Sequence, residues 1–215
     1  MSADDHRTTQ VTEFWSSDFG NEYTVRNAAT EEAIQLRLRG LVRIWDAMRG
    51  DPPASILECG CNVGINLRAF RRFTQAELHA VEPNRKARES VVADGILPAE
   101  RVRDATLEQL PFDDATMDLV FTAGVLIHVP PDRLERACRE VHRVSRKYVL
   151  ALEYFSRNPE AIRYRGQDNL LFKRDFGSFY LDLFSDLVPV AEGFLWRRTT
   201  GHDDVTWWLF RKRGA

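Results

Sequence analysis

The chain has 215 residues, which is enough for one domain with a full hydrophobic core. Its hydrophobic fraction of 44% is ordinary for a globular protein, and its net charge of −2 gives no electrostatic footprint for nucleic acid. The longest apolar run is too short to span a bilayer, and the N-terminus lacks the pattern of a signal peptide. The three cysteines show no zinc spacing. We therefore expect a cytoplasmic protein with no metal site, no membrane segment and no nucleic-acid partner.

Aromatic side chains are concentrated ahead of the first long helix, within an expected N-terminal arm of residues 1–29. Tyr23, Arg26 and Asn27 combine aromatic and polar groups there, which predicts a lid over a ligand. Packing of the aromatic rings on the domain is the alternative, and the two roles are compatible. The residues up to Val11 are polar, and we expect them to be disordered.

Residues 55–67 are the most informative part of the chain. An apolar run ends in Glu58, a glycine-rich turn follows, and helical spacing begins after it. Gly60, Asn62 and Gly64 all tolerate positive φ angles in that turn. A strand, a tight turn and a helix N-terminus together form a pocket lined with backbone N–H groups, at the edge where open α/β sheets bind ligands.

A second acid, Glu82, ends the next predicted strand, Glu77–Glu82. An acid at that place in a βαβ unit accepts hydrogen bonds from ribose hydroxyls, so the turn and the acid together predict a nucleoside site. A turn used only for close packing is the alternative. A dinucleotide is a less suitable ligand, because Asn62 and Ile65 occupy the second and third glycine places of the G-x-G-x-x-G fingerprint.

The pattern E-x-G-x-N-x-G at Glu58 to Gly64 resembles motif I of the class I S-adenosylmethionine-dependent methyltransferases. In that family the first acid lies near the methionine part of the cofactor and the later acid holds the ribose. The resemblance extends to a D-A pair at Asp104 and Ala105, which implies a place beside the adenine; a helix cap is the alternative for Asp104. The implied cofactor is S-adenosyl-L-methionine, converted to S-adenosyl-L-homocysteine. The expected cofactor-binding residues are Tyr23, Arg26, Asn27, Glu58, Gly60, Asn62, Gly64, Asn66, Glu82, Asp104, Ala105 and Gly124.

Strands and helices alternate along residues 30–215, which predicts a single domain with a parallel α/β sheet. The last two predicted strands, Pro189 to Trp196 and Val205 to Lys212, are joined by a polar loop and read as an antiparallel pair. That ending is typical of the methyltransferase fold and not of the plain dinucleotide fold. We expect a Rossmann-like seven-stranded sheet, mostly parallel, with a terminal antiparallel hairpin and helices on both faces.

The acceptor of the methyl group is expected to bind beside the ends of the fourth and fifth strands. His128 follows the fourth strand, and the ordinary pKa of a histidine suits a general base; a structural histidine is the alternative. Glu153 ends the fifth strand and is the second candidate catalytic group. The segment at about 154–176 is an expected acceptor-site insertion, whose basic and aromatic side chains suit an anion. A solvated basic stretch is the alternative. Its candidate substrate-binding residues are Tyr154, Tyr164, Arg165, Lys173 and Arg174.

A narrower resemblance runs through nearly the whole chain. The stretches G-V-L-I-H at 124–128, Y-R-G at 164–166 and L-F-K-R-D-F at 171–176 look like those of the methylases associated with pseudaminic acid biosynthesis. This implies a small acceptor such as a sugar acid, a nucleotide-linked sugar or a natural-product intermediate. A nicotinamide-dependent oxidoreductase and a catalytically silent cofactor-binding protein are the alternative functions. The sequence does not predict the oligomeric state.

Overall fold

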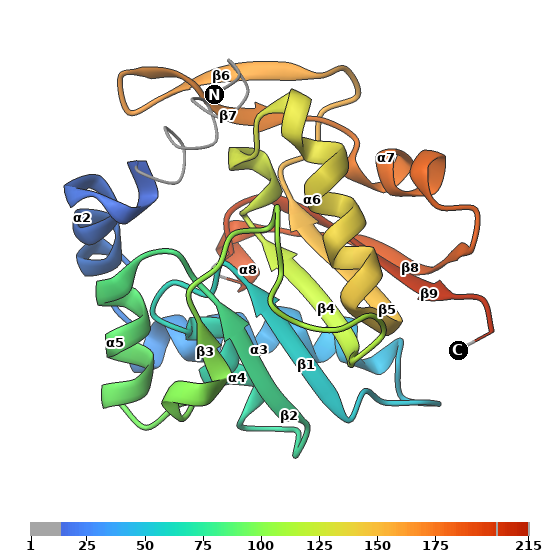
Figure 1. Cartoon of the computed structure of the whole chain (residues 1–215), viewed down its shortest axis with the longest axis horizontal. Helices are drawn as coiled ribbons and strands as arrows, with labels where there is room; N and C mark the ends of the chain where they lie inside the picture. Colours follow the sequence, from blue (N-terminus) through green and yellow to red (C-terminus); the bar gives the residue numbers. More distant parts are fainter. Residues whose placement is uncertain (1–13, 201, 215) are drawn as a thin grey trace.

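The computed structural model describes residues 14–200 and 202–214, and the expectation for the residues up to Val11 lies outside them. The described residues form one seven-stranded sheet in the order β3-β2-β1-β4-β5-β9-β8 (Figure 1). The strands are β1 (Ser55–Cys59), β2 (Glu77–Val81), β3 (Val102–Arg103), β4 (Met117–Ala123), β5 (Ser145–Glu153), β8 (Leu187–Leu195) and β9 (Val205–Lys212). Strands β1 to β5 pair in parallel, whereas β9 is antiparallel to both β5 and β8. The predicted fold class is confirmed.

Both faces of the sheet are apolar and covered by helices (Figure 1). Side chains alternate between the faces, so Ile56 and Phe121 join one core whereas Leu57 and Val120 join the other. The first core contains side chains from α3 (Glu31–Asp46), α4 (Ile65–Phe70) and α5 (Arg85–Ala93). The second contains side chains from α6 (Pro131–Val144) and α7 (Phe176–Leu183). Burial on both faces explains why the central strands read as continuous apolar runs.

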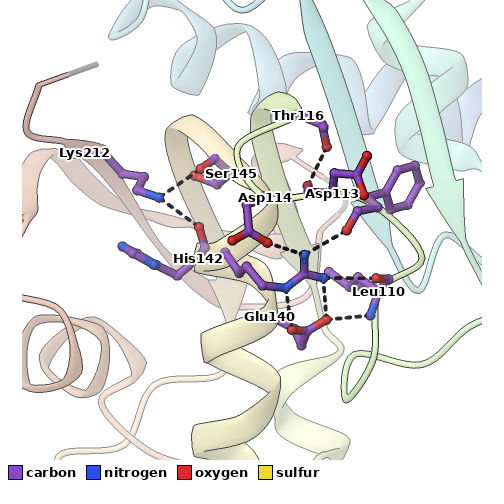
Figure 2. A network of polar contacts seen from close by, with 10 residues as sticks. Leu110, Asp113, Asp114, Thr116, Glu140, His142, Ser145 and Lys212 are labelled. Carbon is purple, nitrogen blue, oxygen red and sulfur yellow. Dashed lines mark hydrogen bonds and ion pairs between the residues drawn. The ribbon is translucent and has the colours of Figure 1, made fainter.

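A polar network fixes the edge of the sheet where β5 begins (Figure 2). Arg143, in the last turn of α6, donates to the carbonyl oxygen of Leu110 at 3.1 Å and pairs with Asp114 at 2.7 Å. The ammonium of Lys212 donates to the carbonyl oxygen of Ser145 at 3.0 Å. These contacts hold the loop before β4 and the start of β5. They lie at the amino ends of these strands, so they support the fold on the edge opposite the ligand site.

A two-stranded hairpin and a helix lie beyond the carboxyl ends of the sheet strands (Figure 1). The hairpin consists of β6 (Glu160–Tyr164) and β7 (Gln167–Lys173), and the helix is α2 (Asp18–Arg26). Arg165 and Gly166 form the hairpin turn with φ angles of 50° and 81°, the sign that a two-residue type I′ turn requires at both central positions. The sequence predicted an insertion here but not its strands.

The short helical segments also include η1 (Ala99–Arg101), η2 (Leu126–His128) and α8 (Arg197–Thr200). Of the helices within residues 14–200 and 202–214, none has the length and apolar character needed to cross a membrane. The same residues contain no cluster of side chains suited to a metal ion.

Candidate functional site

The loop between β1 and α4 has three residues in the left-handed region. The φ angles are 75° at Gly60, 47° at Asn62 and 72° at Gly64. Gly60 is required there for two reasons. Its φ angle is positive, and a Cβ would lie 2.7 Å from a methyl group of Val125. The prediction of a tight turn with positive φ angles is confirmed.

Glu82 joins this loop to the end of β2. Its carboxylate is buried, and it accepts hydrogen bonds from the backbone N–H groups of Asn62 at 2.8 Å and Asn84 at 2.9 Å. Burial raises the pKa of this carboxyl, and the two backbone donors oppose the shift. Each oxygen has a second lone pair, so Glu82 can accept further hydrogen bonds from a ligand that lies in the adjacent cavity.

Glu58 lies at the end of β1 with its side chain fully buried. One oxygen accepts a hydrogen bond from Asn66 at 2.7 Å, whereas the other has no partner within the described residues. Burial raises the pKa of the carboxyl to about 8, while the Asn66 hydrogen bond and the charge of Arg37 oppose the shift. A buried oxygen without a partner is costly, so this one fits a cationic or hydrogen-bond-donating ligand.

A cavity of about 170 Å³, here called the loop cavity, lies above the β1–α4 loop. Its lining includes Tyr23, Asn27, Arg37, Glu58, Gly60, Asn62, Asn66, Glu82, Gly124 and His128. Gly64 is outside that lining, and its left-handed backbone instead begins α4.

An apolar cavity of about 100 Å³ lies beside the loop cavity, and Ala105, Leu107, Val125 and His128 are in its lining. This is a suitable environment for the flat face of a base. Asp104 is not in the lining, because its exposed carboxylate forms an ion pair with Arg88 at 2.7 Å. The structure therefore brings Ala105 to the site and leaves Asp104 at its margin.

The N-terminal arm is fixed against the β1–α4 loop. The hydroxyl of Thr24 donates to the side-chain oxygen of Asn62 at 3.2 Å, and the amide of Asn84 donates to the carbonyl oxygen of Trp15 at 2.9 Å. Tyr23 contributes to the loop cavity from the same helix. The arm thus lies beside the predicted cofactor site, although a lid function remains a prediction.

The sequence interpretation missed Arg37, a largely buried side chain on α3. Its guanidinium contacts Nδ1 of His202, and because a guanidinium only donates, the proton of His202 must be on Nε2. Burial lowers the pKa of Arg37, whereas the nearby Asp203 and Tyr23 raise it. Among the residues that the structure describes, no carboxylate forms an ion pair with Arg37. A buried guanidinium without a carboxylate fits an anionic ligand.

The sequence does hold a signal for Arg37. Arg37 lies three residues after Ile34 and four before Leu41, on the stripe of α3 that packs against the sheet. A charged residue within such an apolar stripe indicates either a buried ion pair or a ligand contact. No comparable periodic signal marks His202, which lies in a polar loop.

A third cavity of about 390 Å³, the hairpin cavity, lies beneath the β6–β7 hairpin and next to the loop cavity. Its lining includes Tyr23, Arg26, Arg37, His128, Tyr154, Tyr164, Arg165, His202 and Asp203. The structure therefore brings together His128, Tyr154, Tyr164 and Arg165 from the predicted acceptor site.

Two predicted acceptor residues lie outside the hairpin cavity. The ammonium of Lys173 is 5.5 Å from the ring centroid of Tyr154, and Lys173 is not in the cavity lining. The guanidinium of Arg174 lies 4.0 Å from the ring centroid of Phe179 on α7. Arg174 is thus directed toward α7, and the sequence spacing alone did not show that neighbouring residues in this segment point different ways.

Glu153 is also absent from the cavity linings. Its carboxylate is fully buried and accepts hydrogen bonds from the backbone N–H groups of Leu126 at 3.1 Å and of Val125 and Ile127 at 3.3 Å. Burial raises its pKa to about 7. The contacts of Glu153 fix the backbone of η2, which carries His128, so the geometry suits a positioning residue.

His128 has the geometry of a neutral base. Its Nδ1 donates to the carbonyl oxygen of Leu170 on β7 at 2.6 Å, which leaves a lone pair on Nε2. Burial lowers its pKa to about 4, whereas the Leu170 hydrogen bond opposes the shift. This differs from the near-neutral pKa expected from the sequence, because the rings of Trp15 and Tyr164 cover the imidazole at centroid distances of 4.7 and 5.4 Å.

Comparison with known proteins agrees with this arrangement. Residues 57–150 match the family model described as a methyltransferase domain. The chain has no match among curated proteins. Among solved structures, it is similar to the 1,6-didemethyltoxoflavin-N1-methyltransferase of Burkholderia thailandensis, with bound 1,6-didemethyltoxoflavin and S-adenosylhomocysteine. The TM-score is 0.67 with 19% identity over 99% of this chain and 91% of the other.

Two further structures share the fold. Magnesium protoporphyrin IX methyltransferase from Synechocystis PCC 6803, with bound S-adenosylmethionine, has a TM-score of 0.68 with 13% identity over 95% of this chain and 96% of the other. An S-adenosylmethionine-dependent methyltransferase from Leishmania major has a TM-score of 0.68 with 15% identity over 94% of this chain and 81% of the other. The chain thus contains a match to a methyltransferase domain within a fold shared with these methyltransferases, which were solved with S-adenosylmethionine or S-adenosylhomocysteine or are named for it. The predicted enzyme class and cofactor are confirmed at that level, and the oxidoreductase alternative is set aside.

Proposed function

We propose that the protein transfers a methyl group from S-adenosyl-L-methionine to a small anionic acceptor in the hairpin cavity. The observation that carries the proposal is the continuity of the two cavities. The loop cavity and the hairpin cavity share Tyr23, Asn27, Arg37, Asn66, Ala123, Gly124 and His128 in their linings. A donor in one cavity and an acceptor in the other would meet at these shared residues, as in-line transfer requires.

The residues of the loop cavity fit the cofactor, which supplies an activated methyl group on a sulfonium when bound. Glu82 would accept hydrogen bonds from the ribose hydroxyls, and the free oxygen of Glu58 would face the positively charged methionine part. Arg37 would bind the carboxylate of that part. The apolar cavity at Ala105 and Leu107 would take the adenine. Tyr23 and Asn27 would cover the bound molecule from the arm.

The charges of the hairpin cavity support an anionic acceptor. Arg26 and Arg165 reach it from the end of α2 and from the hairpin turn, and guanidinium groups bind carboxylates and phosphates in bidentate fashion. His128 would take the proton of the acceptor hydroxyl or amine on Nε2, because its other ring nitrogen is bonded to Leu170. Glu153 would hold the backbone that carries this histidine.

The names of the neighbours support a small acceptor. One was solved with 1,6-didemethyltoxoflavin, and another is named for magnesium protoporphyrin IX. The sequence resemblance to methylases associated with pseudaminic acid biosynthesis favours a sugar acid, a nucleotide-linked sugar or a related natural-product intermediate, and the reduced cysteines favour the cytoplasm. This finer assignment is part of the proposal.

The test is transfer of labelled methyl from S-adenosylmethionine to a panel of acids and matched neutral compounds. We expect S-adenosylhomocysteine to form with at least one carboxylate or phosphate acceptor, and Arg165→Lys to raise the KM for it at unchanged affinity for S-adenosylhomocysteine. Transfer to neutral compounds alone would contradict the anionic acceptor. Binding of cofactor without transfer to any panel member would favour the silent cofactor-binding protein.

A further inference from the structure

The polar groups of the hairpin cavity are of two chemical kinds. Arg26, Arg37 and Arg165 present guanidinium groups, which donate hydrogen bonds and accept none. They come from three separate elements: the end of α2, the middle of α3 and the hairpin turn. Arg37 lies in the linings of both cavities and would bind the carboxylate of the cofactor, so Arg26, which also pairs with Glu22 at 3.4 Å, and Arg165 are the groups that an anionic acceptor would meet.

The second kind of group only accepts. The phenol of Tyr154, at the end of β5, donates its proton to Oδ2 of Asp203 at 2.7 Å, so only its lone pairs remain available. Burial and the neighbouring Asp203 raise the pKa of this phenol, which keeps the proton in place. Asp203 Oδ1 and His128 Nε2 are acceptors as well, because His128 Nδ1 donates to Leu170.

Asp203 is the charged member of this accepting set, and neither the cofactor nor the anionic group of the acceptor accounts for it. Asp203 shares the cavity lining with the arginines, and its charge acts on Arg37; such a carboxylate weakens the binding of an anion unless the ligand also brings it a hydrogen-bond donor. The hydrogen bond from Tyr154 satisfies only one of its two oxygens. Nearby, the polar contacts of His202 are with Arg37 and not with Asp203.

We propose that Asp203, held by Tyr154, is a specificity-determining residue that accepts a hydrogen bond from a hydroxyl group of the acceptor. This inference rests on the proposed function, because it concerns the same acceptor site. An acid without hydroxyl groups would displace the water that donates to Asp203 and Tyr154 and would offer no donor in its place. A neutral polyol would leave the guanidinium groups without an anion. Asp203, Arg26 and Arg165 are exposed in the ligand-free protein, so each loss costs the hydrogen bonds that the acceptor would make once it covers these side chains. The site therefore selects for an anion and a hydroxyl in one molecule.

The test uses three probes of one ring size, titrated calorimetrically into the full chain saturated with S-adenosylhomocysteine. D-glucuronate has a carboxylate and hydroxyls, cyclohexanecarboxylate has only the carboxylate, and methyl glucoside has only the hydroxyls. We expect glucuronate to bind about 10-fold more tightly than either of the others, the scale of one charge-assisted hydrogen bond. In Asp203→Asn the preference over cyclohexanecarboxylate should fall to about 3-fold or less, through weaker binding of glucuronate.

The matched control is Asp204→Asn, since Asp204 is adjacent, exposed and bonded to the backbone N–H of Arg197 outside the cavity lining. It should keep the preference of the parent, and all three proteins should bind S-adenosylhomocysteine equally. The role of Asp203 would be overturned if the parent binds glucuronate and cyclohexanecarboxylate equally, or if Asp203→Asn keeps the preference for glucuronate. Either result would leave the anionic acceptor in place. If neither acid binds, the anionic acceptor is wrong and the role of Asp203 falls with it.

Discussion

The loop cavity and the hairpin cavity differ in how the chain builds them. The loop cavity depends on neighbouring segments at the ends of β1 and β2, where Glu82 bonds to the backbone of Asn62 and Glu58 bonds to Asn66. The hairpin cavity is assembled from the end of α2, the tip of the β6–β7 hairpin and the loop before β9. The acids and the turn of the first come from one βαβ segment, and Tyr23, Arg37 and His128 join them from elsewhere, whereas the second has no such segment and depends on tertiary packing throughout.

The two cavities also differ in the ionisable groups that line them. Buried acids, Glu58 and Glu82, face the loop cavity, whereas Arg26 and Arg165 reach the hairpin cavity. Arg37 lies in the lining of both. This division suits a cationic methyl donor on one side and an anionic acceptor on the other, and the expected effects below separate the two sides.

The largest effect is expected at His128, where the cavities meet. His128→Ala should lower kcat by about 10²–10⁴, the usual contribution of a general base. Because burial lowers the pKa of His128 to about 4, the contribution of His128 to the activity of the parent should be lost as the pH drops through about 4, where the ring becomes protonated. The variant should lack that acid limb in steady-state measurements.

His142→Ala is the control, because His142 stacks on Phe184 at the far end of α6. It should leave kcat unchanged. A parent-like kcat in His128→Ala would remove this histidine from the reaction.

The second effect concerns the buried acid of the loop cavity. The pKa of Glu58 is about 8 in the folded protein against an ordinary 4.5, so the native state binds more protons than the unfolded state between these values. The free energy of unfolding of the ligand-free protein should therefore fall as pH rises from about 4.5 to 8, by about 2–4 kcal/mol. Denaturant titrations of Glu58→Gln should show a smaller fall in the free energy of unfolding over the same pH range. An identical slope in parent and variant would contradict the burial of an ionisable Glu58.

Arg37→Met should have the third effect. Loss of a charge-assisted hydrogen bond of about 1.5–3 kcal/mol should weaken S-adenosylhomocysteine binding about 10- to 100-fold. Arg43→Met, on an exposed turn of the same helix, should bind like the parent. An unchanged dissociation constant in Arg37→Met would contradict its contact with the cofactor and would leave Arg37 as a residue of the acceptor site alone.

The smallest effect is expected at the hairpin turn. Gly166 has a φ angle of 81° with open space around its missing Cβ, so Gly166→Ala should cost about 1 kcal/mol from backbone strain alone. The acceptor KM should rise several-fold, with cofactor affinity unchanged. Gly50→Ala, also in open space but without a positive φ, is the matched control and should be neutral or slightly stabilising. Equal KM values in both variants would show that the turn does not shape the acceptor site.

The same contrast explains what the sequence predicted. The bounds of β9 and the positive φ angles at Gly60, Asn62 and Gly64 were predictable, because periodicity and turn chemistry are local properties. The roles of Arg37, His202 and Asp203 depend on elements distant in the sequence, so spacing did not reveal them. Within the insertion, Arg165 lies in the turn before β7 whereas Arg174 follows the other end of that strand, so their separation was not predictable without knowing the hairpin.

The most direct test of this division is calorimetric titration of S-adenosylhomocysteine into the parent, Glu82→Gln and Arg165→Lys. Glu82→Gln keeps the size of the side chain but removes the charge that is expected to hold the ribose, so binding should weaken about 10-fold or more. Arg165→Lys changes only the hairpin cavity and should bind like the parent. Equal affinities in all three proteins, or a loss in Arg165→Lys as large as that in Glu82→Gln, would contradict the assignment of the cofactor to the loop cavity.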